Sequence, residues 1–331
     1  MITKRTLLGG IAALTVACAA IGAQANELKL AHFASTKYHL HNEMFVPLSE
    51  ALAEATGGET TIRVYPGGEL GAGPVKQYDR VVDGVADISY ALPGYTASQF
   101  KQTLMVEIPG VVTPGRNKTE ALWDNIDLLD KEFRRTKLLG LWTAADAVLL
   151  MADKKVETLA DLEGLKIRVP SKNTGRLIEA WGATAVSMPI TQVYQSMETG
   201  VVDGTLVDAS VLSSFKLGEV TKYITGGMNA TNSVFMLVMN RDSWADLDEE
   251  TQAKLTDLTG AALSEGGRVT MTNAADKALA AWMAEGGEFI ELSPEAAAEF
   301  NAASDALAAE VIAELDGDGV NASGWAAALR Q

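Results

Sequence analysis

Arg168 is the residue whose type and position most strongly suggest binding chemistry. Leu165, Ile167 and Val169 alternate around it as in a half-buried strand, and Pro170 ends that pattern. An arginine at the carboxyl end of a parallel strand faces the crevice in which α/β folds bind ligands. Its guanidinium group can hold a carboxylate through two parallel hydrogen bonds. The strand pattern alone also fits a surface arginine, since most arginines are exposed.

Aromatic and acidic residues offer further contacts for a solute. Asp208 and Asp146 can accept a hydrogen bond from a hydroxyl or an amine, or bind a cation beside a carboxylate. A helix cap or a solvated loop is the alternative role, and for Asp146 it is the favoured one. Four aromatic residues lie at or just beyond predicted strand ends, where they line a cleft or pack in the core: Phe33, Tyr90, Trp142 and Phe235.

Catalytic and metal-binding motifs are scarce in the chain. The three histidines, His32, His39 and His41, could form a zinc site. However, no acidic ligand lies at helical spacing from them, and no H-E-x-x-H pattern occurs. There is also no G-x-S-x-G, no Walker loop and no G-x-G-x-x-G after a strand. We therefore predict no catalytic residue, no metal site and no cofactor.

Hydrophobic periodicity predicts the elements that position these residues. A period of two indicates strands and a period near 3.6 indicates amphipathic helices, with glycine or proline at the ends. The opening order of strand, helix, strand, helix, strand predicts βαβ units and a mainly parallel sheet. The predicted elements are Leu28–Phe33, Asn42–Thr56, Thr60–Tyr65, Pro74–Asp83 and Asp87–Ala91, and later the helical region Asp248–Met283, the strand Glu288–Leu292 and a helix from Ser293 to about Leu315.

A turn in the first half of the chain has a counterpart in the second half. In each, an aromatic and an apolar residue precede a glycine, a valine and an aspartate at identical spacing. Each copy predicts a helix that ends at a glycine, followed by a short step into a strand. Such turns are common in α/β proteins, but the match favours two similar lobes. The copies are Tyr78, Val81, Gly84, Val85 and Asp87, and Tyr194, Met197, Gly200, Val201 and Asp203.

The first 25 residues have the features of a secretory signal peptide. Lys4 and Arg5 form a basic start, Leu7–Ile21 is apolar, and Ala23–Ala25 fits a cleavage site. This predicts export to the periplasm. A lipoprotein with Cys18 as its acylated residue is the alternative. Cleavage after residue 25 leaves no cysteine, hence no disulfide and no thiolate metal site.

The net charge of −16 excludes some partners. An acidic surface disfavours nucleic acid and anionic membranes. It does not exclude an anionic ligand, because the local field of a site can oppose the global charge. The length of 331 residues predicts about two domains.

An ordered set of segments resembles the solute-binding proteins of TRAP transporters, the DctP-type family. A single match of this kind is weak, whereas the ordered set covers most of the chain. The segments are Leu28–His32, Tyr65–Gly71, Gly84–Ile88, Leu162–Pro170, Gly182–Ala183, Val193–Tyr194 and Gly200–Gly204.

The resemblance implies a type II periplasmic-binding-protein fold with two α/β lobes, a ligand cleft between them and a long helix that crosses both. We expect lobe I at 26–144 plus about 233–272, and lobe II at 145–232 plus about 273–331. In this family the arginine that matches Arg168 grips the carboxylate of a transported organic acid. The closed protein then delivers the solute to the membrane permease subunits of the transporter and catalyses no reaction.

Departures from the family pattern indicate the kind of acid. Members that bind sugar acids or dicarboxylates often carry a second arginine where this chain has Val148. Val207 replaces an asparagine that touches the ligand, and Leu92 replaces a polar residue. These changes predict a monocarboxylate with an apolar or aromatic remainder. His32, which ends the first strand and can donate a hydrogen bond, and Ile190 complete the predicted ligand-binding residues.

Three other functional classes stay open at this point. A binding protein of an ATP-driven importer would share the two lobes, although the segment Gly164–Pro170 argues against it. A sensor protein that binds a solute and docks on a receptor would have a similar cleft. A periplasmic enzyme or metal-binding protein would need the histidines.

Overall fold

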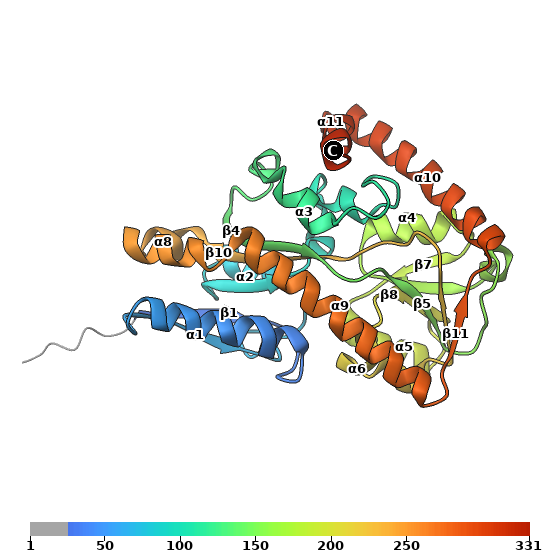
Figure 1. Ribbon diagram of the computed structural model, residues 1–331, viewed down its shortest axis with the longest axis horizontal. Coiled ribbons are helices and arrows are strands. Elements are labelled where there is room, and N and C mark those ends of the chain that lie inside the picture. The colour runs from blue at the N-terminus through green and yellow to red at the C-terminus, as the bar shows by residue number, and fades with distance from the viewer. Residues whose placement is uncertain (1–25) are drawn as a thin grey trace, which may run out of the picture.

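The computed structural model describes residues 26–331, which form two β-sheets flanked by helices (Figure 1). The first sheet has the strand order β2-β1-β3-β10-β4, and the second has the order β11-β9-β5-β8-β6-β7. We call the units built on these sheets lobe I and lobe II. The predicted signal peptide and Cys18 lie outside the described residues. The strands are β1 (Asn26–Ala31), β2 (Thr60–Tyr65), β3 (Ile88–Ala91), β4 (Thr136–Thr143), β5 (Val148–Met151), β6 (Lys166–Val169), β7 (Thr184–Ser187), β8 (Gly204–Val207), β9 (Tyr223–Gly226), β10 (Val234–Asn240) and β11 (Glu288–Glu291).

Each sheet combines parallel and antiparallel pairs. In lobe I, β1 pairs in parallel with β2 and β3, as the βαβ pattern predicts, while β10 pairs antiparallel with β3 and β4. In lobe II, β6 pairs in parallel with β7 and β8, while β5 pairs antiparallel with β8 and β9. Because β10 of lobe I lies in the chain after β5 to β9 of lobe II and before β11 of lobe II, the chain crosses between the lobes more than once.

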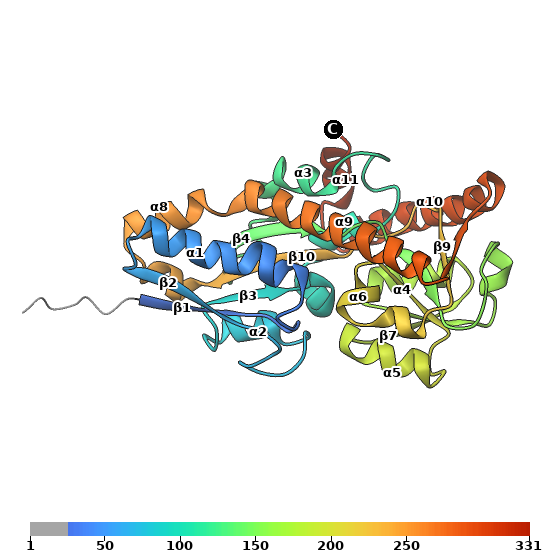
Figure 2. The same cartoon turned by 60° about the horizontal axis from the view of Figure 1, so that its bottom comes forward.

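Helices cover both sheets, and α9 crosses from one lobe to the other. Figures 1 and 2 show α9 running along the molecule past both sheets, and it contacts β4 of lobe I and α6 of lobe II. The α-helices are α1 (Val46–Ala55), α2 (Gln77–Val82), α3 (Lys118–Trp123), α4 (Lys172–Ala180), α5 (Val193–Glu198), α6 (Val211–Ser214), α7 (Arg241–Ala245), α8 (Glu249–Asp257), α9 (Gly260–Ala284), α10 (Pro294–Gly317) and α11 (Ala322–Leu329). A π-helical turn, His41–Phe45, precedes α1, and short 3-10 helices lie at Pro93–Gln99, Thr103–Glu107, Ile126–Leu129, Leu159–Leu162, Ile190–Gln192 and Leu217–Val220.

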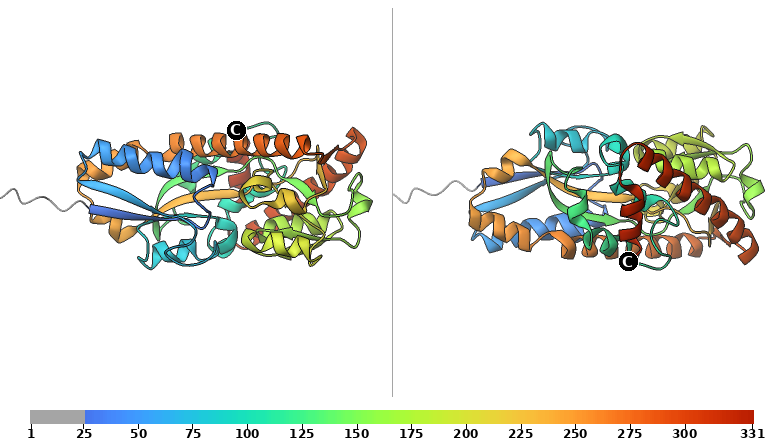
Figure 3. Two further views of the ribbon diagram at one scale, coloured as in Figure 1. Left: turned by 90° about the horizontal axis from the view of Figure 1, so that it is seen from below. Right: turned by 90° about the horizontal axis from the view of Figure 1, so that it is seen from above.

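The C-terminal helices touch both lobes. Helix α10 packs on α4 of lobe II, while α11 packs on α3 of lobe I. The right-hand view of Figure 3 shows α10 lying over lobe II and leading back to α11. The main-chain oxygen of Leu329 accepts a hydrogen bond from Nη1 of Arg116 at 3.0 Å. The division of the chain into lobes at 144/145, 232/233 and 272/273 stays a prediction. Helix α11 falls in the segment predicted for lobe II, and it contacts α3 of lobe I.

The repeated turn has the same geometry in both lobes. Gly84 and Gly200 each have φ of 70°, which is the left-handed conformation that glycine adopts without strain. The carboxylate of Asp87 accepts the backbone N–H of Lys29 at 2.8 Å, and that of Asp203 accepts the backbone N–H of Lys166 at 2.8 Å. Each aspartate therefore ties the start of its own strand to the neighbouring parallel strand.

The hydrophobic core continues across the boundary between the lobes. One cluster contains Leu30 and Phe45 of lobe I together with Val207, Leu212 and Ile224 of lobe II. The lobes are thus closed upon each other, and residues from both shape the space between them. Within residues 26–331, no helix combines the length and the hydropathy needed to cross a bilayer.

Candidate functional site

A small cavity lies between the lobes at the carboxyl ends of several strands. Its volume is about 30 Å³, which leaves room for only one or two water molecules. A larger solute therefore requires the lobes to separate or lining side chains to move. The lining residues are Phe33, Tyr38, Leu92, Tyr95, Arg168, Pro170, Ile190, Val207, Asp208, Ser210, Val211, Phe215, Ser233, Phe235 and Met271.

Local sequence places Arg168 at this cavity. Strand β6 buries Ile167 and Val169 on the side away from it, and the chain then turns into α4, whose N-cap is Ser171. Neighbouring β8, which pairs with β6 on one side and with β5 on the other, starts with Gly204, and this glycine permits a close approach to β5. A Cβ atom there would lie 2.5 Å from the carbonyl oxygen of Leu150. The arginine is therefore held on a strand that is hydrogen-bonded on both sides, to β7 and to β8.

The guanidinium group of Arg168 is buried without a carboxylate partner. Arg168 is 1% exposed, and its Nε donates a hydrogen bond to the carbonyl oxygen of Met188 at 2.9 Å. Among residues 26–331, it forms no ion pair with an aspartate or glutamate. Burial lowers its pKa, although arginine remains protonated in proteins. Burying an uncompensated charge is costly, so this site favours an incoming anion.

Tyr95 of lobe I reaches across to this arginine. Its hydroxyl lies 3.4 Å from Nη2 of Arg168, and it also accepts the backbone N–H of Ile190 at 3.1 Å. Both partners belong to lobe II. Closure of the lobes therefore adds a polar group from lobe I to the surroundings of the arginine.

Aromatic rings form the walls of the cavity. Phe215 of lobe II stacks on Phe33 of lobe I, with ring centroids 6.5 Å apart and an interplanar angle of 24°. Phe235 lies on β10 and stacks on Tyr90 behind it, at 5.3 Å. Stacked rings of this kind suit a flat apolar ligand.

A second polar patch surrounds Asp208, which follows β8. Asp208 is 4% exposed, and the backbone N–H of Ser210 donates to its Oδ1 at 3.1 Å. Burial raises the pKa of Asp208, and hydrogen bonding by Ser210 opposes that effect. Tyr38 lies nearby, with its hydroxyl 2.8 Å from that of Tyr90.

Of the predicted ligand-binding residues, seven line this cavity and four lie elsewhere. Tyr90 is buried behind Phe33 and Phe235, and Trp142 is covered by α9. Val148 lines a separate, larger groove beside α9, and His32 is buried in lobe I. The seven in the lining are Phe33, Leu92, Arg168, Ile190, Val207, Asp208 and Phe235.

His32 contacts other side chains of lobe I. Its Nε2 lies 2.9 Å from Nδ1 of His41, and its ring packs on Phe45. Burial, with a smaller effect of His41, lowers the pKa of His32 to about 3, and burial lowers that of His39 to about 4. Both rings are therefore neutral at pH 7. Across the described part of the chain, no three His, Cys, Asp or Glu side chains gather as metal ligands.

Sequence reasoning did not identify Tyr38, Tyr95 and Phe215 as cavity residues. Each lies in a loop or short helix several residues beyond a strand end, whereas the predicted cleft residues lie at or just beyond the strand ends. The rule that ligands lie outside the carboxyl ends of parallel strands would have included Tyr95, which follows β3.

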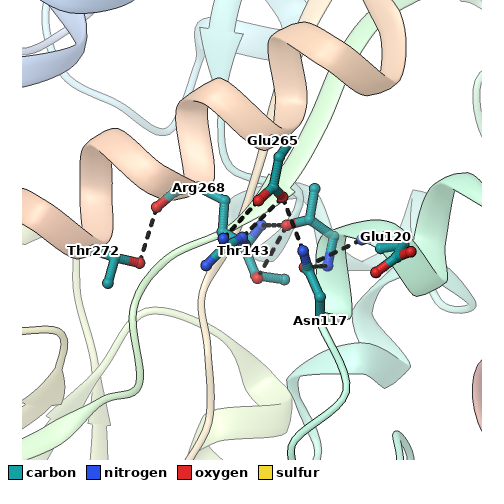
Figure 4. Close-up of polar contacts among 7 residues, drawn as sticks. Asn117, Glu120, Thr143, Glu265, Arg268 and Thr272 are labelled. Atoms are coloured by element: carbon teal, nitrogen blue, oxygen red, sulfur yellow. Dashed lines mark hydrogen bonds and ion pairs between the residues drawn. The ribbon is translucent and has the colours of Figure 1, made fainter.

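A larger groove of about 590 Å³ lies beside α9, and most of its charged side chains already have hydrogen-bonding partners. Nε of Arg268 donates to Glu265 at 2.9 Å, and Glu265 also accepts from Asn117 at 2.9 Å, as Figure 4 shows. Nζ of Lys118 donates to Asn232. These contacts fasten α9 and the strand connections to lobe I. Lys118 differs from Arg168 in having acidic groups close by, since the charges of Asp146 and Glu107 both act on it.

Solved structures and curated proteins share this architecture. A TRAP solute-binding protein from a marine metagenome, solved with 3-hydroxybenzoate and described as specific for aromatic acid ligands, is 26% identical, with a TM-score of 0.88 over 92% of this chain and 97% of that one. A TRAP solute-binding protein from Rhodoferax ferrireducens with copurified benzoate has a TM-score of 0.86 at 24% identity, over 92% and 96% of the two chains. The outer membrane transporter protein TsaT of Comamonas testosteroni is 26% identical, over 77% of this chain and 76% of its own.

A family model matches most of the chain as well. The model of the DctP family, described as bacterial extracellular solute-binding protein, family 7, matches residues 30–315. This range includes both sheets, the cavity and α9. The predicted two-lobed α/β fold and the predicted family are confirmed. The chain belongs to the DctP family of extracellular solute-binding proteins, the solute receptors of TRAP transporters, which bind small organic acids.

Proposed function

We propose that this protein binds an aromatic monocarboxylate between its lobes and delivers it to the membrane permease of a TRAP transporter. Arg168 holds the carboxylate by two parallel hydrogen bonds, and the aromatic walls hold the ring. Tyr95 completes the site when the lobes close. The protein acts by binding and release and catalyses no reaction.

The observation that carries this proposal is the buried, uncompensated guanidinium group of Arg168. It lines an interlobe cavity and contacts only neutral oxygen acceptors within residues 26–331. Among the described residues, Arg168 is the one cationic side chain in the cavity lining, and one guanidinium group can neutralise one carboxylate of the solute. The apolar Leu92 and Val207 leave no second cationic or amide group in the lining for a dicarboxylate or a sugar acid.

Two related structures support the aromatic part of the proposal. At 26% identity, a marine metagenome protein specific for aromatic acid ligands was solved with 3-hydroxybenzoate and with metahydroxyphenylacetate. The paired rings of Phe33 and Phe215 give this chain a comparable means of holding a flat ring.

Export to the periplasm is part of the same proposal. The basic start and the apolar run of residues 1–25 direct secretion, and cleavage after Ala25 releases the mature protein. Mass spectrometry of protein from a periplasmic extract tests this, since the mature form must begin at Asn26. An acylated N-terminus at Cys18 would contradict it.

A thermal-shift screen tests the ligand class. Mature protein is heated with aliphatic monoacids, 2-oxo acids, aromatic acids, dicarboxylates and sugar acids. A ligand that binds only the folded state raises the melting temperature. We expect aromatic monocarboxylates to give the largest shifts. A shift from dicarboxylates or sugar acids alone would refute the proposal.

A further inference from the structure

The cavity holds a second buried charge whose role the carboxylate clamp does not explain. Asp208 lines the cavity and is 4% exposed. Within residues 26–331, the hydrogen-bond donors to its carboxylate belong to the adjacent turn: the backbone N–H of Ser210 donates to Oδ1 at 3.1 Å, and the Ser210 side chain also contributes. No lysine, arginine or histidine of the described chain forms an ion pair with it. Because a carboxylate has about four acceptor positions, Asp208 can still accept a hydrogen bond from a ligand.

Asp208 and Arg168 belong to different polar patches of the same cavity. The charge of Asp208 contributes to raising the pKa of Tyr38 and of Tyr90, so Asp208 lies near these two hydroxyls. Arg168 instead interacts with Tyr95. The two opposite charges do not pair with each other. The same lining includes three apolar rings, those of Phe33, Phe215 and Phe235. A solute that satisfies both patches has a carboxylate on one side of a ring and a hydrogen-bond donor on another.

A hydroxyl group fits the Asp208 patch better than an ammonium group does. An ammonium group has three donors and a large desolvation cost, so it needs several acceptors. A phenolic hydroxyl has one donor, which a remaining acceptor position of the Asp208 carboxylate can accept. It also adds no charge to a cavity whose walls are aromatic.

We propose that Asp208 accepts a hydrogen bond from a hydroxyl group on the solute, so that the protein selects hydroxylated aromatic monocarboxylates over the parent acids. The inference rests on the proposed function and adds a specificity-determining residue to it. A parent acid lacks this hydroxyl, so no ligand donor reaches the Asp208 carboxylate in the closed cavity. The missing hydrogen bond is the source of the discrimination.

Calorimetric titration of the mature protein with matched acids tests the inference. The pairs are benzoate against 3- and 4-hydroxybenzoate, and phenylacetate against 3-hydroxyphenylacetate, with 3-(aminomethyl)benzoate as the ammonium probe. At least one hydroxylated acid is expected to bind about ten- to a hundredfold more tightly than its parent, because the hydrogen bond is to a charged group. Equal affinities for every pair would overturn the inference, and so would tighter binding of the ammonium probe.

The variant Asp208→Asn connects the preference to this residue. Its amide oxygen can still accept the N–H of Ser210, so the local turn is retained. We expect the preference for the hydroxylated acid to fall below threefold, while the parent acid binds as well as before or better. The matched control is Asp153→Asn, which changes an aspartate whose side chain is 70% exposed and should leave the preference intact.

The outcomes separate this inference from the proposed function. If the wild-type protein binds no aromatic acid of either kind, the proposed function itself fails. If it binds parent and hydroxylated acids equally, only the role of Asp208 fails. An unchanged preference in Asp208→Asn would also overturn that role.

Discussion

The hydroxyl of Tyr95 lies 3.4 Å from Nη2 of Arg168, so a side chain of lobe I meets the candidate carboxylate clamp of lobe II. The same hydroxyl accepts the backbone N–H of Ile190 at 3.1 Å. Tyr95 thus joins the lobes through two hydrogen bonds that exist only in the closed form. In a hinge protein, such contacts favour closure around the solute.

Replacing Tyr95 by phenylalanine should weaken solute binding modestly. The ring stays and the hydroxyl is lost, which removes hydrogen bonds with a net contribution of about 0.5–1.5 kcal/mol each. We expect affinity to fall about two- to tenfold, measured by calorimetry with the best acid from the thermal-shift screen. The melting temperature of the ligand-free protein should fall by no more than a few degrees, because the same hydrogen bonds are present there. Unaltered affinity would show that the hydroxyl does not contribute to closure.

Removal of the Arg168 side chain should abolish tight binding. Breaking a buried charge pair costs about 3–5 kcal/mol, which corresponds to roughly a hundredfold to several-thousandfold in affinity. The variant Arg168→Ala should remain folded, because in the ligand-free protein this charge has no carboxylate partner. Calorimetric affinity within threefold of the wild type would refute the carboxylate clamp.

Arg176→Ala provides the matched control for this variant. Arg176 is an arginine of the same lobe, and it pairs with Glu310 at 2.8 Å and with Glu314 at 2.7 Å, away from the cavity lining. Its loss should leave solute affinity unchanged and cost at most a small amount of stability, since partly exposed ion pairs contribute little.

Stability should depend on pH through Glu107, which links the lobes. Ser171 Oγ of lobe II donates to Oε2 of this glutamate at 2.7 Å. Burial raises the pKa of Glu107 from 4.5 to about 7, so the folded protein retains a proton that the unfolded chain has already released. Stability from this group is therefore present below pH 4.5 and is lost as pH rises towards 7.

Comparison with Glu107→Gln isolates this effect, because glutamine resembles the protonated acid. Between pH 4.5 and 7.5, the free energy of unfolding of the wild type should fall by roughly 2–3 kcal/mol relative to the variant. The charge of Lys118 also acts on Glu107, and Lys118 is present in both proteins. Urea titrations across this range provide the measurement, and parallel pH profiles would contradict the prediction.

Two adjacent glycines of α9 should respond oppositely to alanine. A Cβ at Gly267 would lie 2.6 Å from Cε of Met44 and 3.0 Å from Cε2 of the buried Trp142, whereas a Cβ at Gly266 would meet nothing within 4 Å. Both changes gain helix propensity, about 1 kcal/mol. Only the change at Gly267 overpacks the core, at a cost of about 1–3 kcal/mol.

Thermal or urea unfolding of the two variants tests this packing. Gly266→Ala should be as stable as the wild type or more so, and Gly267→Ala should be less stable than Gly266→Ala by about 1–3 kcal/mol. Equal stabilities would mean that α9 is not packed closely against Trp142.

Much of the scaffold could be predicted from local sequence. The strand Thr60–Tyr65 has the predicted bounds, and α10 begins after the predicted cap Ser293, whose Oγ accepts the backbone N–H of Ala296. These features depend on residues that are neighbours in the chain, and for this reason they could be predicted from the sequence. The predicted helical region Asp248–Met283 is divided into α8 and α9 at a break before Gly260, whose φ is 74°.

The sequence by itself placed Arg168 near the end of a strand that Pro170 terminates, because alternation and chain breakers are local properties. The lining of the cavity was decided by the tertiary structure. His32 and Phe33 are adjacent in sequence, yet only Phe33 lines the cavity, since the packing of lobe I encloses His32 beside His41. Likewise, Tyr95 reaches Arg168 only because the lobes close, and closure depends on contacts between residues far apart in the chain.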